Sequence, residues 1–385
     1  MFLVKVCDRI TARQFLEVNP MINREDPNWV RPLDKDIRDV FDPNKNKAYR
    51  FGKTERWILK GTGENLIGRI AAFANKKYKN KGDDVTVGGI GFFDCINNQE
   101  AADMLFDVAK HWLLQQGMQA MDGPINFGER DRWWGLLVEG FEPPVYHLNY
   151  NPPYYKTLFE QYGFKPFYNQ ICFAAKPRKP LQQKIIQRHA AVAADPDFSV
   201  SWFKHNDLDK VAADFTTVYN EAWAGHGGLK EINKQTILKM FQTMKPVMDK
   251  KIIWFAYYKT EPIALFVNLP DLNQWFRSLD GKFDLLAKLK FLWLKRTRPC
   301  TRFVGLVFGV VPRYQNKGVD AFLATESHKD MQALPYDDYE MQWIGDFNPK
   351  MISVAEALGA HPNRKLVTYR YLFDRLKEFK RHPII

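Results

Sequence analysis

The chain has 385 residues, of which 45% are hydrophobic and 26% are charged, and its formal net charge at pH 7 is +12. These proportions are those of a folded protein and exclude a chain that is disordered throughout. The length corresponds to two or three domains, at roughly 100–200 residues per domain. No apolar run reaches the roughly 18–20 residues that a membrane-spanning helix needs. The first residues become charged too soon for a signal peptide, so we expect a cytoplasmic protein.

The four cysteines lie far apart, at Cys7, Cys95, Cys172 and Cys300. None stands in a Cys-x-x-Cys pair or beside a histidine cluster, so the sequence predicts no metal site and no redox site. Their sparse use is typical of a reducing compartment, where we expect them to be small buried core residues.

The positive charge favours a polyanionic partner, which would be a nucleic acid, an anionic membrane or a phosphorylated cofactor. It is concentrated in residues 76–82 and 282–298. We expect the first segment to be a hairpin tip and the second a basic amphipathic helix with a solvated face, a role at a lipid or nucleic-acid surface being the alternative. The chain contains no zinc-finger, RRM or helix-turn-helix pattern, so a nucleic acid is not the expected partner.

The first half of the chain predicts a hairpin, a strand, two helices and a final strand. β-rich runs at 57–60 and 66–75 flank a turn-forming cluster, as in an antiparallel hairpin. An apolar strand at 85–93 leads into an amphipathic helix at 100–116, whose apolar residues recur at three- and four-residue steps. A short helix then starts at its expected N-cap, Asn151, and ends at a glycine. The strand 167–174 closes this half.

The second half repeats this order after a charged, Pro-containing joint at 176–198, where we expect an exposed linker with one short helix. The matching segments are the hairpin 254–258 and 263–268, the strand 303–311, the helices 318–334 and 348–359, and the strand 366–373. Landmarks that recur in the same order indicate two copies of one plan. We therefore predict an α+β protein with two tandem domains, each a mostly antiparallel mixed sheet flanked by helices. The predicted domains are 1–178 and 198–385, joined by a linker at 179–197.

Residues 310–319, which read Val-Val-Pro-Arg-Tyr-Gln-Asn-Lys-Gly-Val, follow a strand and open a helix. Backbone N–H groups at such a helix start bind the diphosphate of a nucleotide-like cofactor, and Gly318 permits close approach because it has no Cβ. Together with the order of elements, this segment resembles the pyrophosphate loop of the acyl-CoA N-acyltransferase (GNAT) superfamily, V-x-P-x-[YF]-[QR]-x-x-G-[VI]-[GA]. It departs from that form at Asp320, whose carboxylate would repel phosphate.

The resemblance implies that the second domain binds acetyl-CoA or another acyl-CoA. The residues predicted to bind this cofactor are Val310, Val311, Arg313, Gln315, Asn316, Lys317, Gly318, Val319 and Asn348. In the first domain Ala101 takes the place of Gly318, and Asp94 and Glu100 add negative charge, so we expect a degenerate loop there. The chain also resembles a group of tandem-GNAT acetyltransferase-like proteins at 121–124, 135–141 and 151–155, which implies a fold and no substrate.

The catalytic set is less complete than the cofactor loop. The superfamily often places a tyrosine acid four residues before the glycine that ends the last helix, but Phe159 and Ala355 stand there. The candidates that remain are Glu340 and Asp346, which flank an expected strand, and Tyr369 on the final strand. A carboxylate could deprotonate an amine, and a tyrosine could protonate the leaving thiolate.

His226, in a glycine-rich turn, is a further candidate base. We predict a CoA-dependent N-acyltransferase that moves an acetyl group from acetyl-CoA to a small-molecule or peptide amine, with the second domain catalytic. One alternative is an aminoacyl-tRNA-dependent transferase of the tandem-GNAT kind, which would bind tRNA through its basic surface. The other is a non-catalytic CoA-binding or scaffold protein, which the missing tyrosine favours. The sequence indicates neither the acceptor nor an oligomeric state.

Overall fold

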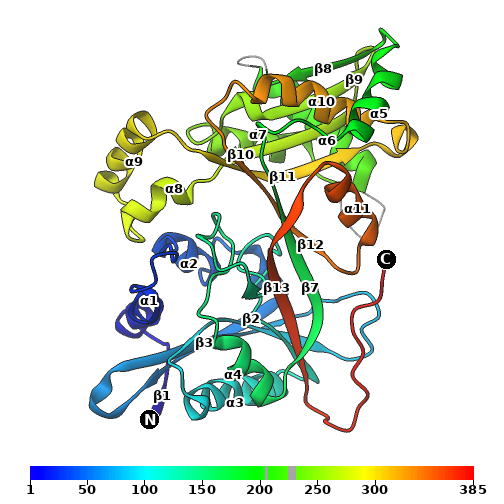
Figure 1. Ribbon diagram of the computed structural model, residues 1–385. Helices are drawn as coiled ribbons and strands as arrows, with labels where there is room; N and C mark the ends of the chain where they lie inside the picture. Colours follow the sequence, from blue (N-terminus) through cyan, green and yellow to red (C-terminus); the bar gives the residue numbers. More distant parts are fainter. Residues whose placement is uncertain (204–206, 224–230) are drawn as a thin grey trace.

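One mixed sheet runs through the whole molecule in the computed structural model, which describes residues 1–203, 207–223 and 231–385 (Figure 1). Its strands in the first half are β1 (Phe2–Lys5), β2 (Gly52–Lys60), β3 (Leu66–Asn75), β4 (Val87–Cys95), β5 (Ala120–Gly123), β6 (Leu136–Glu139) and β7 (Lys165–Ala175). Those in the second half are β8 (Phe198–Trp202), β9 (Ile253–Tyr258), β10 (Glu261–Pro270), β11 (Arg302–Val310), β12 (Asp338–Gly345) and β13 (His361–Leu372).

The described helices flank this sheet and confirm the expected mixed α+β class (Figure 1). The first half contributes α1 (Arg9–Asn23), α2 (Asp34–Val40), α3 (Gln99–Gln115) and α4 (Tyr155–Tyr162). The joint forms α5 (Gln183–Ala193), and the second half contributes α6 (Leu208–Trp223), α7 (Lys234–Met244), α8 (Asn273–Phe276), α9 (Leu285–Thr297), α10 (Val319–Met331) and α11 (Pro349–Ala357).

The two halves are joined by an exchange of their last strands. The sheet order is β1-β2-β3-β4-β5-β13-β7-β12-β11-β10-β9-β8, with β6 paired to β13. β13 ends the second half but pairs with β5 of the first, as in Tyr369↔Gly123. β7 ends the first half but pairs with β12 of the second, as in Tyr339↔Ala175. β7 and β13 also pair with each other, so each half completes the sheet of the other (Figure 1).

The first-half sheet is covered on both faces because its strand residues alternate between two cores. Trp57 and Leu59 pack with α3 and α4, whereas Ile58 packs with α1 and α2. In the second half, α6, α7 and α10 contribute to one large apolar core. Among the described residues, no helix combines the length and the apolar character needed to cross a membrane.

Two expected local features are wrong. Cys7 is exposed, whereas Cys95, Cys172 and Cys300 are buried as expected. Asn151 does not cap α4, whose N-cap is Tyr154 without a side-chain hydrogen bond. The Asn151 amide instead accepts from the Leu137 amide (2.8 Å) and donates to the Leu137 carbonyl (3.1 Å), which fixes the end of β6. In the second half the corresponding Asn348 does cap α11, because its side chain accepts from the Met351 amide at 3.2 Å.

Candidate functional site: a cavity where β11 and β12 separate

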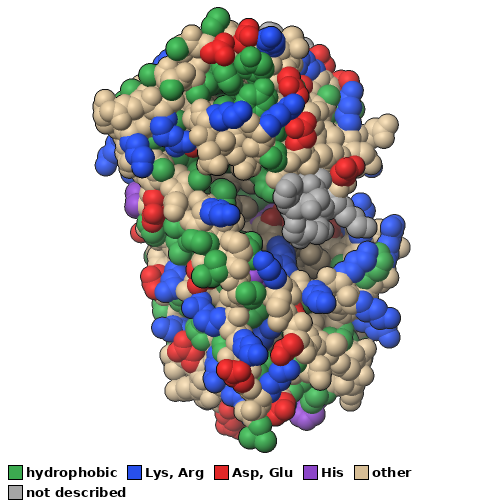
Figure 2. Space-filling model, turned by 90° about the vertical axis from the view of Figure 1, so that its right-hand side faces the viewer, with side chains coloured by type: hydrophobic (Ala, Val, Ile, Leu, Met, Phe, Trp, Pro, Cys, Tyr) green, Lys and Arg blue, Asp and Glu red, His purple; other side chains and the backbone are tan. Residues whose placement is uncertain are grey.

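The only parallel strand pairs in the described part of the sheet are β4–β5 and β11–β12, one in each half. The pairing of β11 with β12 runs from Arg302↔Asp338 to Gly305↔Met341 and then stops, although both strands continue. A cavity of about 680 Å³ opens at this separation. The side of the molecule on which α11 lies is hollowed at mid-height (Figure 2).

The walls of this cavity are mostly apolar. They come from β10, β11, β12, α6, α10, α11 and the segment that precedes α5, with single residues from the ends of β7 and β13 and two from the first-half loop at 130–131. The apolar side chains include Phe266, Leu306, Phe308, Met331, Met341 and Ile344. Polar and charged side chains line the remainder and include Arg130, Asp131, Lys176, Lys179, Ser327, His328 and His361. An apolar space with a few polar groups is the usual form of a small-molecule site.

Tyr339 stands where the two strands part. Its ring stacks on Phe303 with a centroid distance of 4.7 Å, and its hydroxyl lies 2.3 Å from the point that a Cβ on Gly305 would occupy. The hydroxyl makes no hydrogen bond to another described residue, although Tyr339 lines the cavity and is otherwise buried. Burial raises the pKa of Tyr339, so this phenol keeps its proton at neutral pH. The sequence did not single out Tyr339, but Gly305 within a strand was a signal of close approach.

The loop that resembles a pyrophosphate site lies beyond one end of the cavity. A 3₁₀ turn at Pro312–Tyr314 leads to Gly318, which is left-handed (φ 87°) and precedes α10 as its N-cap. No side chain caps this helix, and the amides of Lys317 and Gly318 have no acceptor among the described residues. An uncapped helix start of this kind attracts anions.

Helix α5 packs closely against Gly318, which has no Cβ. The carbonyl oxygen of Arg188 lies 2.9 Å from the position of a Cβ on Gly318, and Val192 lies 3.2 Å from it. The Arg188 guanidinium also forms an ion pair with Asp320 at 2.6 Å. Asp320 is the position at which the loop departs from the superfamily's motif. The Arg188 guanidinium offsets the negative charge of its carboxylate at the start of α10.

The other residues predicted for the cofactor are spread around this loop. The Arg313 guanidinium is paired with Glu261, and the Gln315 amide donates to the Val310 carbonyl at 3.0 Å. The Lys317 ammonium lies 5.4 Å from the Tyr314 ring centroid. Val310, Val311 and Val319 are buried, and Asn348 caps α11.

The equivalent helix start in the first half is closed. Asn98 caps α3 through an oxygen that accepts from the Ala101 amide at 2.8 Å. Where β4 leaves β5, the Tyr155 hydroxyl accepts from the Cys95 amide at 2.9 Å. The rings of Phe93, Phe106 and Phe159 pack beside it, with centroids 4.7–5.3 Å apart. The first half thus offers fewer free donors to an anion than the second.

The three predicted catalytic residues do not come together, and none of them lines the cavity. Tyr369 lies in the first-half core, where its hydroxyl donates to Glu160 at 2.9 Å and burial raises its pKa. Asp346 accepts from the Asn169 side chain at 2.9 Å and from Arg381 at 2.6 Å. The third residue, Glu340, is buried in the network described below. His226 lies outside the described residues.

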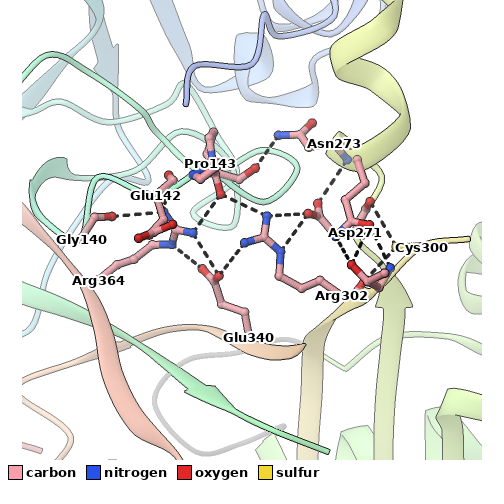
Figure 3. A network of polar contacts seen from close by, with 12 residues as sticks. Gly140, Glu142, Pro143, Asp271, Asn273, Cys300, Arg302, Glu340 and Arg364 are labelled. Atoms are coloured by element: carbon pink, nitrogen blue, oxygen red, sulfur yellow. Dashed lines mark hydrogen bonds and ion pairs between the residues drawn. The ribbon is translucent and has the colours of Figure 1, made fainter. Parts of the chain in front are cut away.

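Glu340 belongs to a buried network that ties the halves together (Figure 3). Its carboxylate accepts from Arg364 at 2.8 and 3.3 Å and lies 3.5 Å from Arg302. Arg364 also donates to the carbonyls of Gly140, Glu142 and Pro143 in the first half. The side chains of Glu340 and Arg364 are 2% and 1% exposed. Both arginines occupy this buried carboxylate, and it does not line the cavity.

The second arginine extends the network toward the second half. Arg302 donates to the Asp271 carboxylate at 2.6 Å and to the Pro143 carbonyl at 3.1 Å. Asn273 in turn donates to the Pro144 carbonyl at 2.9 Å (Figure 3). Among the described residues, no group of three or more His, Cys, Asp or Glu is placed to hold a metal ion.

Solved structures share this architecture. A tandem GNAT protein from the clavulanic acid biosynthesis pathway, without AcCoA, superimposes with a TM-score of 0.52 at 12% identity, over 97% of this chain and 98% of that one. The fold is that of the tandem GNAT proteins. A GCN5-related N-acetyltransferase from Sphaerobacter thermophilus gives a TM-score of 0.52 at 9% identity, with 96% of each chain covered. The expected GNAT resemblance is confirmed at the level of the fold.

Two other proteins are more similar to this chain in sequence than these solved structures are. The chain is 23% identical to the bacterial ceramide synthase of Caulobacter vibrioides over 352 residues, which is 90% of this chain and 91% of that protein. It is 25% identical to protein YghO of Escherichia coli over 368 residues, which is 93% of this chain and 92% of that protein. No protein-family model matches the chain.

Proposed function

We propose that this protein is an N-acyltransferase that moves a fatty acyl group from acyl-CoA to the amine of a long-chain lipid base. The observation that carries the proposal is the apolar cavity of about 680 Å³ at the separation of β11 and β12. Its volume lies within the range of roughly 300–1,000 Å³ that is usual for ligand sites. An acetyl group would leave most of such a space empty, whereas a fatty chain would bury its methylenes there.

The loop before α10 suits the nucleotide part of acyl-CoA. The amides of Lys317 and Gly318 have no acceptor among the described residues, and the exposed Lys317 side chain adds positive charge at this uncapped helix start. Strand β11 runs from this loop to the cavity, since Val310 belongs to the loop and Phe308 to the cavity wall. A thioester held along β11 would therefore place its acyl chain in the apolar space.

Tyr339 is the group that we propose for proton transfer. When the amine attacks the thioester carbon, the C–N bond forms, the C–S bond breaks, the nitrogen loses one proton and the thiolate takes one up. Tyr339 would give its proton to the thiolate, and the proton lost by the nitrogen would restore the phenol through solvent. The Tyr339 phenol is protonated at neutral pH, as an ordinary tyrosine is, and burial raises its pKa further. It also stands at the point where the strands part, with no competing acceptor among the described residues. This residue would replace the tyrosine acid that is missing at Ala355, which itself lines the cavity.

The acceptor is proposed from the relatives. A ceramide is an amide between a fatty acid and a long-chain amino alcohol, and one relative that spans 90% of this chain is named a ceramide synthase. We therefore expect a long-chain amino alcohol, rather than a peptide or a charged tRNA, to be the amine substrate.

The test is an acyl-transfer assay with purified protein, acyl-CoA donors from two to eighteen carbons and a panel of amines. Each methylene that the cavity buries contributes roughly 0.8 kcal/mol, so kcat/KM is expected to rise about fourfold per added carbon until the cavity is full. Free-thiol release and the mass of the amide measure the reaction. Equal rates with acetyl-CoA and palmitoyl-CoA would contradict a fatty acyl donor.

A cavity variant sharpens this assay. Ala324 lines the cavity from α10, and Ala324→Trp is expected to move the preferred donor to a shorter chain. Asp330→Trp is the matched control, because Asp330 lies on the same helix, is exposed and does not line the cavity. If both variants kept the wild-type chain-length profile, the acyl chain would not occupy this cavity.

A further inference from the structure

Helix α9 belongs to an insertion between β10 and β11 and stands at the edge of the second half, beside α8 (Figure 1). Asp284 caps its start by accepting from the Ala287 amide at 2.9 Å. Its inner face is formed by Ala287, Phe291 and Leu294, which are buried. The Phe291 ring packs against Trp275 and Phe276 of α8, with centroid distances of 5.8 and 5.5 Å. The helix is thus fixed to the body by one apolar face.

A second apolar face of α9 points away from the body. Its members are the exposed residues Leu285, Leu286, Leu289, Leu292 and Trp293, whose exposed fractions range from 54% to 77%. At 3.6 residues per turn they fall within an arc of about 120°, opposite the buried face. Single exposed leucines are ordinary, but five large apolar side chains in one contiguous patch mark an interaction surface.

Basic side chains border this outer face. At the same helical spacing, Lys288 and Lys295 lie on one side of the arc and Lys290 on the other. Residues 280–298 include six lysines and arginines and two aspartates. The Lys290 ammonium donates to the Ser278 carbonyl at 2.5 Å, and Lys295 to the Pro246 carbonyl at 2.6 Å, which holds both charges at the flanks.

We propose that the outer face of α9 docks the protein onto a lipid bilayer that carries anionic headgroups. A helix that lies in the interface buries leucine and tryptophan among the acyl chains and keeps its lysines level with the phosphates. A second copy of this chain suits the face less well, because two α9 helices packed together would set their flanking lysines against each other. A nucleic acid would leave the five apolar side chains in water.

The experiment is sedimentation of the full chain with vesicles of phosphatidylcholine alone or with 30% phosphatidylglycerol. We expect binding to the anionic vesicles that is at least tenfold stronger than to the neutral ones and that weakens in high salt. The double variant Leu289→Glu/Trp293→Glu is expected to lose at least tenfold in binding. The vesicles contain neither acyl-CoA nor a long-chain base, so the result is independent of the proposed function.

Ile10→Glu is the matched control, because Ile10 lies on α1 and is 71% exposed, close to the 72% of Leu285. The control is expected to bind vesicles like the wild type, and unchanged melting temperatures would show that all variants fold. Absence of wild-type binding to anionic vesicles would overturn the proposal. So would a double variant that binds normally, or one that only converts a dimer into a monomer in light scattering.

Discussion

At the scale of single residues, the sharpest prediction concerns Tyr339. Tyr339→Phe removes the proposed proton donor, and general acids contribute roughly 10²–10⁴-fold, so kcat is expected to fall at least tenfold with little change in KM. Tyr336→Phe is the control, because both rings are buried against Phe303 and only Tyr339 lines the cavity. The measurement is steady-state kinetics with a fatty acyl-CoA. Equal kcat values for the two variants would remove Tyr339 from the mechanism.

The opposite is expected of Glu340, because its carboxylate is held by Arg364 and Arg302 in the interior. Glu340→Gln leaves the buried Arg364 guanidinium without a counter-charge, whereas Arg302 keeps Asp271. Breaking a buried pair costs about 3–5 kcal/mol. Urea denaturation should therefore show a large loss of stability. Asp338→Asn is the control, since its pair with Lys176 is about half exposed and is expected to contribute about 0–1 kcal/mol. A stable but inactive Glu340→Gln protein would restore Glu340 as a base.

For the residues predicted as catalytic, the sequence indicates their positions on strands but not their hydrogen-bond partners. It reveals which acids flank the strand that became β12, and that Tyr369 lies on the last strand. It does not reveal their partners. The strand exchange brings Tyr369 of β13 to Glu160 in the first half, and Arg364 of β13 reaches Glu340 of β12 across β7. The sequence also did not indicate Tyr339, because its proposed role depends on where β11 and β12 stop pairing.

At the scale of elements, the start of α10 is shaped by α5. Gly318→Ala must hold a left-handed conformation at a cost of roughly 1–2 kcal/mol, and it must also push away the Arg188 carbonyl. Gly117→Ala is the matched control, because Gly117 has a similar φ of 77° and nothing within 4 Å of an added Cβ. We expect Gly318→Ala to lower the melting temperature by several degrees more than the control, even without acyl-CoA. Equal shifts in melting temperature for the two variants would mean that α5 moves to admit the added Cβ without a loss of stability.

Most elements could be predicted because their signals are local. The hairpin strands β2–β3 and β9–β10 and the helices α3, α9, α10 and α11 lie where alternation, helical spacing and Asn-Pro or Gly signals indicated them. The observed role of Asn151, which holds the end of β6 instead of capping α4, could not be predicted, because its partner Leu137 lies 14 residues earlier in the chain. The second apolar face of α9 was visible as leucines in the sequence. Their exposure depends on which face α8 covers.

At the scale of the whole molecule, the repeat is visible in the sequence but the strand exchange is not. Each final strand has the same apolar pattern whichever half it joins, so the sequence favoured two independent domains. The strand pairs instead place β13 between β5 and β7, and β7 between β13 and β12. Neither half of the chain therefore pairs all of its strands by itself. The domain bounds 1–178 and 198–385 stay a prediction about the chain, while the sheet is shared.

The exchange predicts that the halves stay together after the chain is cut. A protease site inserted between Arg178 and Lys179 would separate β7 from the second half in sequence while leaving every strand pair intact. We expect the cleaved fragments to elute as one particle in size-exclusion chromatography and to unfold in one urea transition. Separation would leave unpaired edges on β5 and β12. It would also break the hydrogen bonds that Arg364 donates to the first-half carbonyls of Gly140, Glu142 and Pro143. Two folded fragments that elute separately, or two well-resolved transitions, would show that each half is stable without the strand of the other.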